Sequence, residues 1–116
     1  MSPDLQRILR IREYCVDIQV SIERYGNDRA AFEADLNFQY SVAFAVLQIG
    51  ELTGGLSSQF RSSTESQIQW GAIKGMRNII VHGYGNVDLD VLWETATVNI
   101  PELKAFCDVQ LGKTKE

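Results

Sequence analysis

The stretch QIQWGAIKGMRNIIVHGY, residues 67–84, has the spacing of an amphipathic helix followed by a glycine-flanked turn. Apolar side chains recur in it at helical intervals, at Trp70, Ala72, Ile73, Met76, Ile79 and Ile80, which predicts one helix over residues 67–82. Gly83 and Gly85 are expected to end this helix, because glycine readily adopts the left-handed conformation found at helix ends. The other segments are interpreted as helices that support this one.

The opposite side of the predicted helix is polar. Lys74, Asn78 and His82 follow one another at i,i+4 positions, so Asn78 and His82 are neighbours. Arg77 falls inside the apolar arc, roughly 140° from His82 on the helical projection. A buried guanidinium without a partner is unfavourable, so Arg77 must reach a carboxylate, a phosphate or a partner subunit. Tyr84 is expected on the turn, with an accessible hydroxyl.

Two long helices are predicted before this stretch. The first spans Pro3 to Tyr25 and carries a nearly heptad apolar stripe, consisting of Leu5, Ile8, Ile11, Cys15, Ile18, Ile22 and Tyr25. Gly26-Asn27 ends it, and Asp28 is a candidate N-cap for the next helix. The second spans roughly Arg29 to Leu52, with a break near Asn37 as an open alternative. Its predicted core face is Phe32, Leu36, Tyr40, Ala43, Leu47 and Gly50.

The middle of the second helix, residues 43–49, is apolar nearly all round. This pattern fits a helix with core on one side and a dimer seam on the other, and it fits a central core helix equally well.

The remaining segments complete an all-α chain. Residues 53–66 are rich in glycine, serine and threonine and are predicted to form a loop with one turn near Phe60. Asp88 is expected to cap a last helix that runs to about Leu111, with apolar positions at Leu89, Leu92, Ala96, Leu103 and Phe106. Pro101 lies inside this helix and should kink or break it. The prediction is a single domain over residues 1–116, an antiparallel four- to five-helix bundle with a frayed tail at 111–116.

Composition limits the possible classes of protein. The chain has 116 residues, 45% of them hydrophobic and 22% charged, which is typical of one globular domain. No apolar run approaches a membrane span, and the first residues lack the apolar core of a signal peptide, so a cytoplasmic protein without a membrane partner is expected. Cys15 and Cys107 belong to no Cys/His cluster, so they are expected to be reduced core residues, and neither a metal nor a cofactor is predicted.

Charge is unevenly distributed along the chain. Fifteen acidic and eleven basic residues give a net charge of −4, which excludes a general nucleic-acid binder of the usual basic kind. Residues 61–82 are the exception, because Arg61, Lys74 and Arg77 outweigh Glu65. A local phosphate site is compatible with this pattern, as is a basic partner on the acidic faces.

Arg77, Asn78, His82 and Tyr84 form the pattern R-x4-H-x-Y, which resembles the motif of HepT-like toxins in the HEPN superfamily of small helical ribonucleases. Further segments resemble the family in the same order along the chain: Ile49-Gly50-Glu51, Trp70 with Gly75-Met76-Arg77-Asn78, Val87-Asp88, Trp93 and Ile100-Pro101-Glu102-Leu103. R-x4-H alone arises often by chance, whereas the ordered set is specific. Gly85 departs from the family, in which an aromatic residue often follows the motif tyrosine.

These residue types suit metal-independent RNA cleavage. RNA supplies its own nucleophile in the 2′-hydroxyl, and histidine titrates close to working pH, so His82 can exchange protons with the reacting oxygens. Arg77 can bind the phosphate and stabilise its transition-state charge. Asn78 and Lys74 are supporting candidates, and Glu51 is the expected carboxylate partner of Arg77. A 2′,3′-cyclic phosphate is the expected product.

The resemblance implies more than the residues do. It implies a homodimer with two copies of the motif at one interface, which would also supply a second histidine as acid or base. It further implies a type VII-like toxin–antitoxin pair, in which a partner nucleotidyltransferase, the antitoxin, transfers AMP to Tyr84. Bulk and negative charge placed there would block RNA.

Other interpretations remain open. His82 and Arg77 also fit a helix cap and a structural ion pair, and Tyr84 fits a packing role at a helix end. The alternative function is a non-catalytic partner that binds substrate or nucleotide for a small nucleotidyltransferase. A purely structural helical interaction module is the third.

Overall fold

A computed structural model describes residues 1–81 and 88–112, with the backbone alone described for residues 79–81. Helices account for most of this part of the chain, and it contains no strand. The elements are α1 (Pro3–Arg24), α2 (Arg29–Ala34), α3 (Leu36–Gly54), α4 (Ser58–Thr64), α5 (Trp70–Val81), α6 (Leu89–Glu94), a π-helix η1 (Thr95–Asn99) and α7 (Ile100–Gly112).

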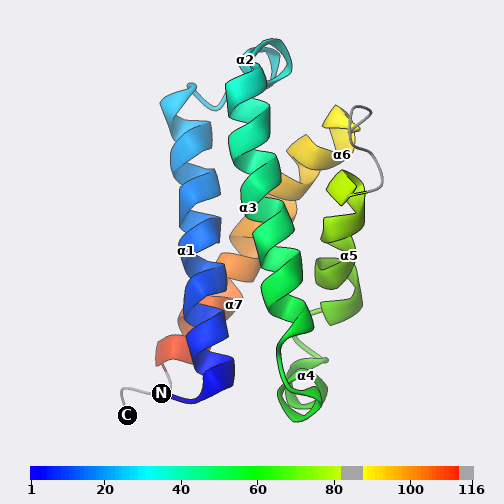
Figure 1. Cartoon of the computed structure of the whole chain (residues 1–116). Coiled ribbons are helices and arrows are strands. Elements are labelled where there is room, and N and C mark those ends of the chain that lie inside the picture. The colour runs from blue at the N-terminus through cyan, green and yellow to red at the C-terminus, as the bar shows by residue number, and fades with distance from the viewer. Residues whose placement is uncertain (82–87, 113–116) are drawn as a thin grey trace.

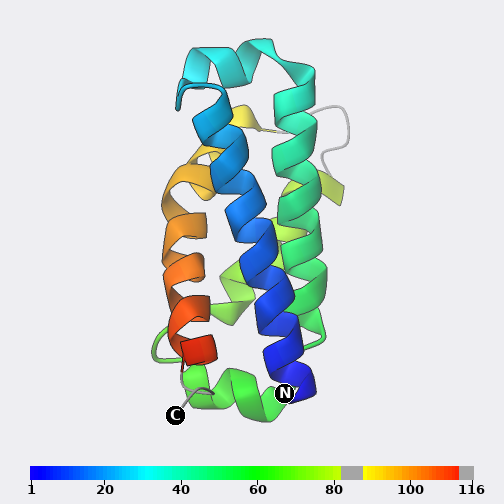
Figure 2. The same cartoon turned by 90° about the vertical axis from the view of Figure 1, so that its left-hand side faces the viewer.

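The long helices alternate in direction, as the colours of Figure 1 show. α1 runs up, α3 down and α5 up, and the run from α6 through η1 to α7 returns down. α3 packs against both α1 and α5, while α7 packs on α1 behind them (Figures 1 and 2). The short helices α2 and α4 lie at opposite ends of the bundle. The predicted all-α antiparallel bundle is therefore confirmed.

The first helix forms as its sequence predicts. The hydroxyl of Ser2 accepts from the backbone N–H of Leu5 at 3.1 Å, and Pro3 occupies the first turn, where its missing N–H costs nothing. The core stripe is buried at Ile8, Ile11, Cys15, Ile18 and Ile22. Gly26 and Asn27 end the segment with φ of 75° and 55°, the left-handed conformation that glycine and asparagine tolerate.

The predicted second helix is broken at Asp35, two residues before the position considered. The Asp35 carboxylate accepts from the backbone N–H of Phe38 at 3.0 Å and so starts α3 as its N-cap. Asp28 caps α2 as predicted, through the N–H of Ala30 at 2.9 Å.

The break rotates the buried face of α3, so the core face predicted for this region is wrong at several positions. Leu36 and Tyr40 are exposed, and Ala43 and Leu47 are only partly buried. The core of α3 is formed instead by Phe38, Val42, Ala45, Val46, Ile49, Gly50 and Thr53. Phe32 and Gly50 are buried as predicted.

The loop predicted for residues 53–66 is largely helical. α3 continues to Gly54, and Ser57 caps α4 through the N–H of Phe60 at 3.1 Å. Asp4 at the start of α1 accepts from both the N–H and the hydroxyl of Ser57, at 2.8 and 2.6 Å. Serine is unfavourable inside helices but favourable at their N-caps. A serine-rich composition therefore predicted a loop where the structure has a capped helix.

The last predicted helix has an irregular middle. Asp88 caps α6 by accepting from the N–H groups of Asp90 and Val91 at 3.0 and 3.3 Å, as predicted. The wide π turn of η1 ends just before Pro101, and it accommodates the carbonyl that proline leaves without an N–H donor. α7 extends to Gly112, so residues 111 and 112 are helical and not frayed, while residues 113–116 lie outside the described residues.

The two cysteines face the core from α1 and α7. Cys15 and Cys107 are free and fully buried. Burial raises the pKa of the Cys107 thiol to about 12 and that of Cys15 further, so neither supplies thiolate at neutral pH. The core role predicted for them is confirmed. Within residues 1–81 and 88–112, no helix has the length and apolarity to cross a bilayer.

Candidate functional site

α5 carries the candidate site and begins at Trp70, three residues later than predicted. The Trp70 indole N–H donates to the buried hydroxyl of Thr64 at 2.8 Å, which fixes the start of the helix against α4. Ile73 and Met76 are buried as predicted, whereas Ala72 is exposed. Of the motif residues, His82, Gly83, Tyr84 and Gly85 lie outside the described residues.

Arg77 pairs with Glu51, the carboxylate expected for it. Nε of Arg77 lies 2.9 Å from Oε1 of Glu51 on α3, and the two side chains are 46% and 52% exposed. Arg77 therefore sits at the rim of the α3–α5 interface, where its guanidinium reaches a carboxylate, one of the three partners expected for it. One carboxylate can accept from at most two of the five guanidinium N–H donors, so Arg77 keeps donors for a second anion.

Gly50 brings the backbones of α3 and α5 together at this point. A Cβ atom added at Gly50 would lie 2.9 Å from Cβ of Arg77 and 3.2 Å from its backbone nitrogen. No residue with a side chain fits there without a shift of one helix. Three consecutive residues of α3 thus have different roles. Ile49 is buried in the core, Gly50 allows the close approach of α5, and Glu51 pairs with the guanidinium of Arg77.

Lys74 and Asn78 are exposed on α5, as the polar stripe predicted. The Cε atom of Lys74 lies 3.9 Å from the Cβ position of Gly54, near the end of α3. The described part of the site therefore combines Glu51, Arg77 and Lys74 at the α3–α5 contact, with Asn78 one helical position beyond Arg77.

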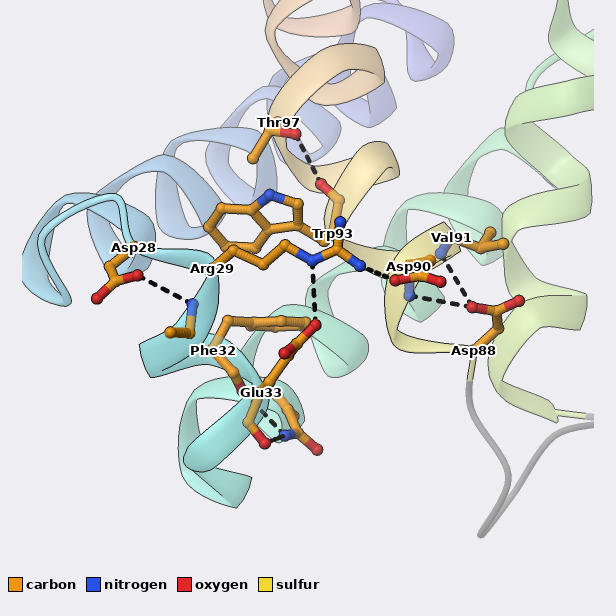
Figure 3. A network of polar contacts seen from close by, with 11 residues as sticks. Asp28, Arg29, Phe32, Glu33, Asp88, Asp90, Val91, Trp93 and Thr97 are labelled. Carbon is orange, nitrogen blue, oxygen red and sulfur yellow. Dashed lines mark hydrogen bonds and ion pairs between the residues drawn. The ribbon is translucent and has the colours of Figure 1, made fainter.

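A polar network anchors the chain where it returns from the motif segment. Figure 3 shows Arg29 of α2 forming ion pairs with Glu33, at 3.1 Å, and with Asp90 of α6. Asp88 caps α6 beside them, and the rings of Phe32 and Trp93 pack with centroids 5.2 Å apart. No sequence pattern singled out Arg29, because Arg29 and Asp90 are too distant in the chain to leave a local signal. Its only signal was its position directly after the predicted cap Asp28.

α3 presents an exposed apolar face next to the site. Leu36, Tyr40 and Phe44 recur every four residues and are 60%, 65% and 56% exposed. Glu51 continues this face toward the end of α3, since it lies about 20° from Phe44 on a helical projection. Phe44 also meets the Tyr14 ring of α1 edge to face, with centroids 6.2 Å apart.

Two depressions of about 340 and 400 Å³ lie around the α4–α5 junction, beside Trp70 and Met76 respectively, and neither is lined by Arg77 or Asn78. Among residues 1–81 and 88–112, no group of three histidine, cysteine or acidic side chains is placed to bind a metal ion. The described chemistry is thus carried by the exposed groups of the α3–α5 contact.

Comparison with known proteins assigns the chain to a class. The family model described as "Ribonuclease HepT-like" matches residues 5–109, so this chain belongs to the HepT-like ribonuclease family. The resemblance drawn from the motif order is confirmed.

Three relatives show the range of similarity. A "Putative RNase" of Caldanaerobacter subterraneus subsp. tengcongensis is 39% identical over 67 residues, covering 58% of this chain and 59% of its own length. A "Probable ribonuclease HepT" of Thermococcus cleftensis is 34% identical over 73 residues, 63% of this chain and 66% of the relative. A "Putative RNase" of Methanocaldococcus jannaschii is 28% identical over 93 residues, 72% and 84% respectively. The chain thus spans less than two thirds of the length of the first two. No solved structure matches it significantly.

Proposed function

We propose that this chain is a metal-independent endoribonuclease and the toxin of a type VII-like toxin–antitoxin pair, acting in the cytoplasm. The observation that carries the proposal is the arrangement of Arg77 in a member of the HepT-like ribonuclease family. The Arg77 side chain is paired with Glu51 and is nearly half exposed. In the sequence, Arg77 precedes the only histidine of the chain by five positions.

The proposed reaction divides the chemistry between these side chains. His82 takes the proton of the RNA 2′-hydroxyl as this oxygen attacks the adjacent phosphorus. Arg77 stabilises the charge on the pentacoordinate phosphate, and Glu51 holds the guanidinium in position without occupying all its donors. The 5′-oxygen leaves with a proton from an acid, and a 2′,3′-cyclic phosphate remains. Asn78 orients the imidazole or the phosphate.

A homodimer would complete this site. One histidine does not easily serve as both base and acid in the same turnover, whereas a two-fold dimer brings a second His82 to the same cleft. The face of Leu36, Tyr40 and Phe44 supports this, because it is largely apolar, more than half exposed in the described chain and continuous with Glu51. Isolated apolar residues are common on protein surfaces, but a row of three large ones on one helix face is typical of an interface.

Control of the enzyme is proposed to act on Tyr84. A partner nucleotidyltransferase, the antitoxin, transfers AMP from ATP to the tyrosine hydroxyl and releases pyrophosphate. This adds bulk and negative charge seven positions after the proposed phosphate-binding Arg77 in the sequence. Mass spectrometry of the chain co-expressed with its antitoxin tests this step. Growth rescued while Tyr84 stays unmodified would contradict it.

The decisive experiment is cleavage of a defined RNA in EDTA by the wild type and His82→Ala, purified in parallel, with the new ends analysed. The proposal expects cyclic-phosphate ends that disappear in the variant. Cleavage that needs added metal, or that survives in His82→Ala, would overturn it. Absence of cleavage by unmodified, dimeric wild type would favour the alternative, a non-catalytic partner of a small nucleotidyltransferase.

A further inference from the structure

The cations of the described chain fall into two groups. Five of them form ion pairs with carboxylates: Arg10, Arg12, Arg29, Arg77 and Lys104. Four form no ion pair with any residue in 1–81 or 88–112: Arg7, Arg24, Arg61 and Lys74. Unpaired cations in an acidic chain are candidates for binding an external anion.

Two of the unpaired cations converge on the end of α3. A Cβ atom at Gly54 would lie 3.9 Å from Cε of Lys74, and one at Gly55 would lie 2.6 Å from Nε of Arg7. Lys74 comes from α5 and Arg7 from α1, the two helices that flank α3 in Figure 1. Because the last residue of α3 and its C-cap are glycines, no Cβ atom separates these two side chains from the end of the helix.

This cluster continues from Arg77. Gly50, against which Arg77 packs, precedes Gly54 by four residues, which is one helical turn or about 5.4 Å. Arg77, Lys74 and Arg7 therefore approach the last turns of α3 and its C-cap at Gly50, Gly54 and Gly55 in turn, toward one end of the bundle.

Two nearby carboxylates, Glu51 and Asp4, are already engaged, as are two carbonyls at the end of α3. Glu51 pairs with Arg77, and Asp4 accepts two hydrogen bonds from Ser57, which together with Arg7 lower the pKa of that carboxyl. The carbonyls of Leu52 and Thr53 accept from backbone N–H groups that follow them. Three cations thus face two committed carboxylates, so the cluster is positive although the chain is acidic.

We propose that Arg7 and Lys74 form a phosphate track that extends from Arg77 and holds single-stranded RNA on one side of the scissile bond. The inference rests on the proposed ribonuclease function, because Arg77 is the residue proposed to bind the reacting phosphate. The track holds the part of the strand that leads away from that phosphate. Contacts of this kind fix the register of a strand without reading its sequence.

The test measures binding of a 2′-O-methylated RNA 12-mer, which lacks the nucleophile and cannot be cleaved, by fluorescence anisotropy at several salt concentrations. The variants are Arg7→Gln, Lys74→Gln and their combination. Arg24→Gln is the matched control, an unpaired arginine of α1 at the opposite end of the bundle. Circular dichroism establishes that each variant is folded.

The track predicts that the double variant binds about tenfold more weakly at low salt and that its slope of log affinity against log salt falls by roughly 1.4, about 0.7 for each lost phosphate contact. Arg24→Gln should stay within about twofold of wild type. A double variant that binds like Arg24→Gln, or a wild type that does not bind the oligonucleotide, overturns the track. Cleavage is measured separately on unmodified RNA, so a wild type that binds through Arg7 and Lys74 but never cleaves refutes the ribonuclease and leaves the track standing.

Discussion

Gly50 of α3 lies against the backbone of Arg77 in α5, so closely that a methyl group at Gly50 would stand 2.9 Å from Cβ of Arg77. The position of the guanidinium therefore depends on the distance between two helix axes. Helix packing and the proposed chemistry meet at this contact.

Gly50→Ala should consequently lower both stability and activity. Relief of the overlap requires α3 and α5 to separate, at a cost of about 1–3 kcal/mol in the free energy of unfolding. Gly75→Ala is the matched control, because no described atom lies within 4 Å of its Cβ position in the interior of α5. Removing a glycine from a helix interior there should stabilise the fold by about 0.5–1 kcal/mol. Urea unfolding of both variants measures the difference, and equal shifts would contradict the close-packing argument.

Glu51 is predicted to position Arg77 and to contribute little to stability. The ion pair is half exposed, so Glu51→Ala should change the free energy of unfolding by less than about 1 kcal/mol. Loss of orientation should reduce kcat/KM for RNA about tenfold. Glu51→Gln keeps an acceptor for Nε and should recover part of this loss, which a merely electrostatic role would not allow.

Glu33→Gln serves as the control for Glu51, because it also weakens a half-exposed ion pair with an arginine, here Arg29 one turn away, at the far end of the bundle. Wild-type kinetics for Glu51→Ala, or an equal effect of Glu33→Gln, would remove Glu51 from the site.

The sequence predicted those features that depend on interactions between residues close together in the chain. Ser, Asp and Gly at helix ends act on N–H groups within three residues, so the ends of α1 and the caps Asp28 and Asp88 were predictable. The Glu51–Arg77 contact was also predictable, because an arginine beside an apolar arc needs a carboxylate and Glu51 belongs to the same resemblance.

Features set by the phase of a helix or by distant residues were not predictable in this way. Because the helix is interrupted at Asp35, the face of α3 that contains Leu36 and Tyr40 points outward. Residues 43–49 are apolar nearly all round, so their periodicity could not show which face of α3 is buried. α4 depends on Asp4, 53 positions before its cap Ser57. The Arg29–Asp90 ion pair joins residues that only the finished fold brings together.

Acid should weaken the contact between α1 and α7. Hydrogen bonds from Lys104 and then Arg12 lower the pKa of Asp108 below its ordinary 3.8. A carboxyl whose pKa is depressed on folding stabilises the protein above its unfolded pKa, and this contribution is lost as the pH falls through the folded pKa. Asp108→Asn should therefore be less stable than wild type at pH 7.

The gap between Asp108→Asn and wild type should close as the pH falls below about 3.8, the pKa of the carboxyl in the unfolded chain. Thermal unfolding from pH 7 to pH 2.5 measures it. Asp17→Asn is the control, since Asp17 is exposed on α1 and makes no ion pair with a described residue. A gap that stays constant with pH would assign the effect of Asp108→Asn to packing instead of charge.

Phe44→Glu is predicted to separate assembly from folding. The ring is 56% exposed, so its replacement should leave the monomer folded, with a loss limited to the edge contact with Tyr14. At a two-fold interface the same change places two like charges close together in an apolar seam, which opposes association strongly. Light scattering should then show a monomer, and RNA cleavage should fall with the dimer fraction. Val109→Glu is the control, because Val109 is 55% exposed on α7, a helix outside the proposed seam. A Phe44→Glu protein that remains dimeric would place the interface elsewhere, and a monomer that cleaves RNA at the wild-type rate would show that one copy of His82 suffices.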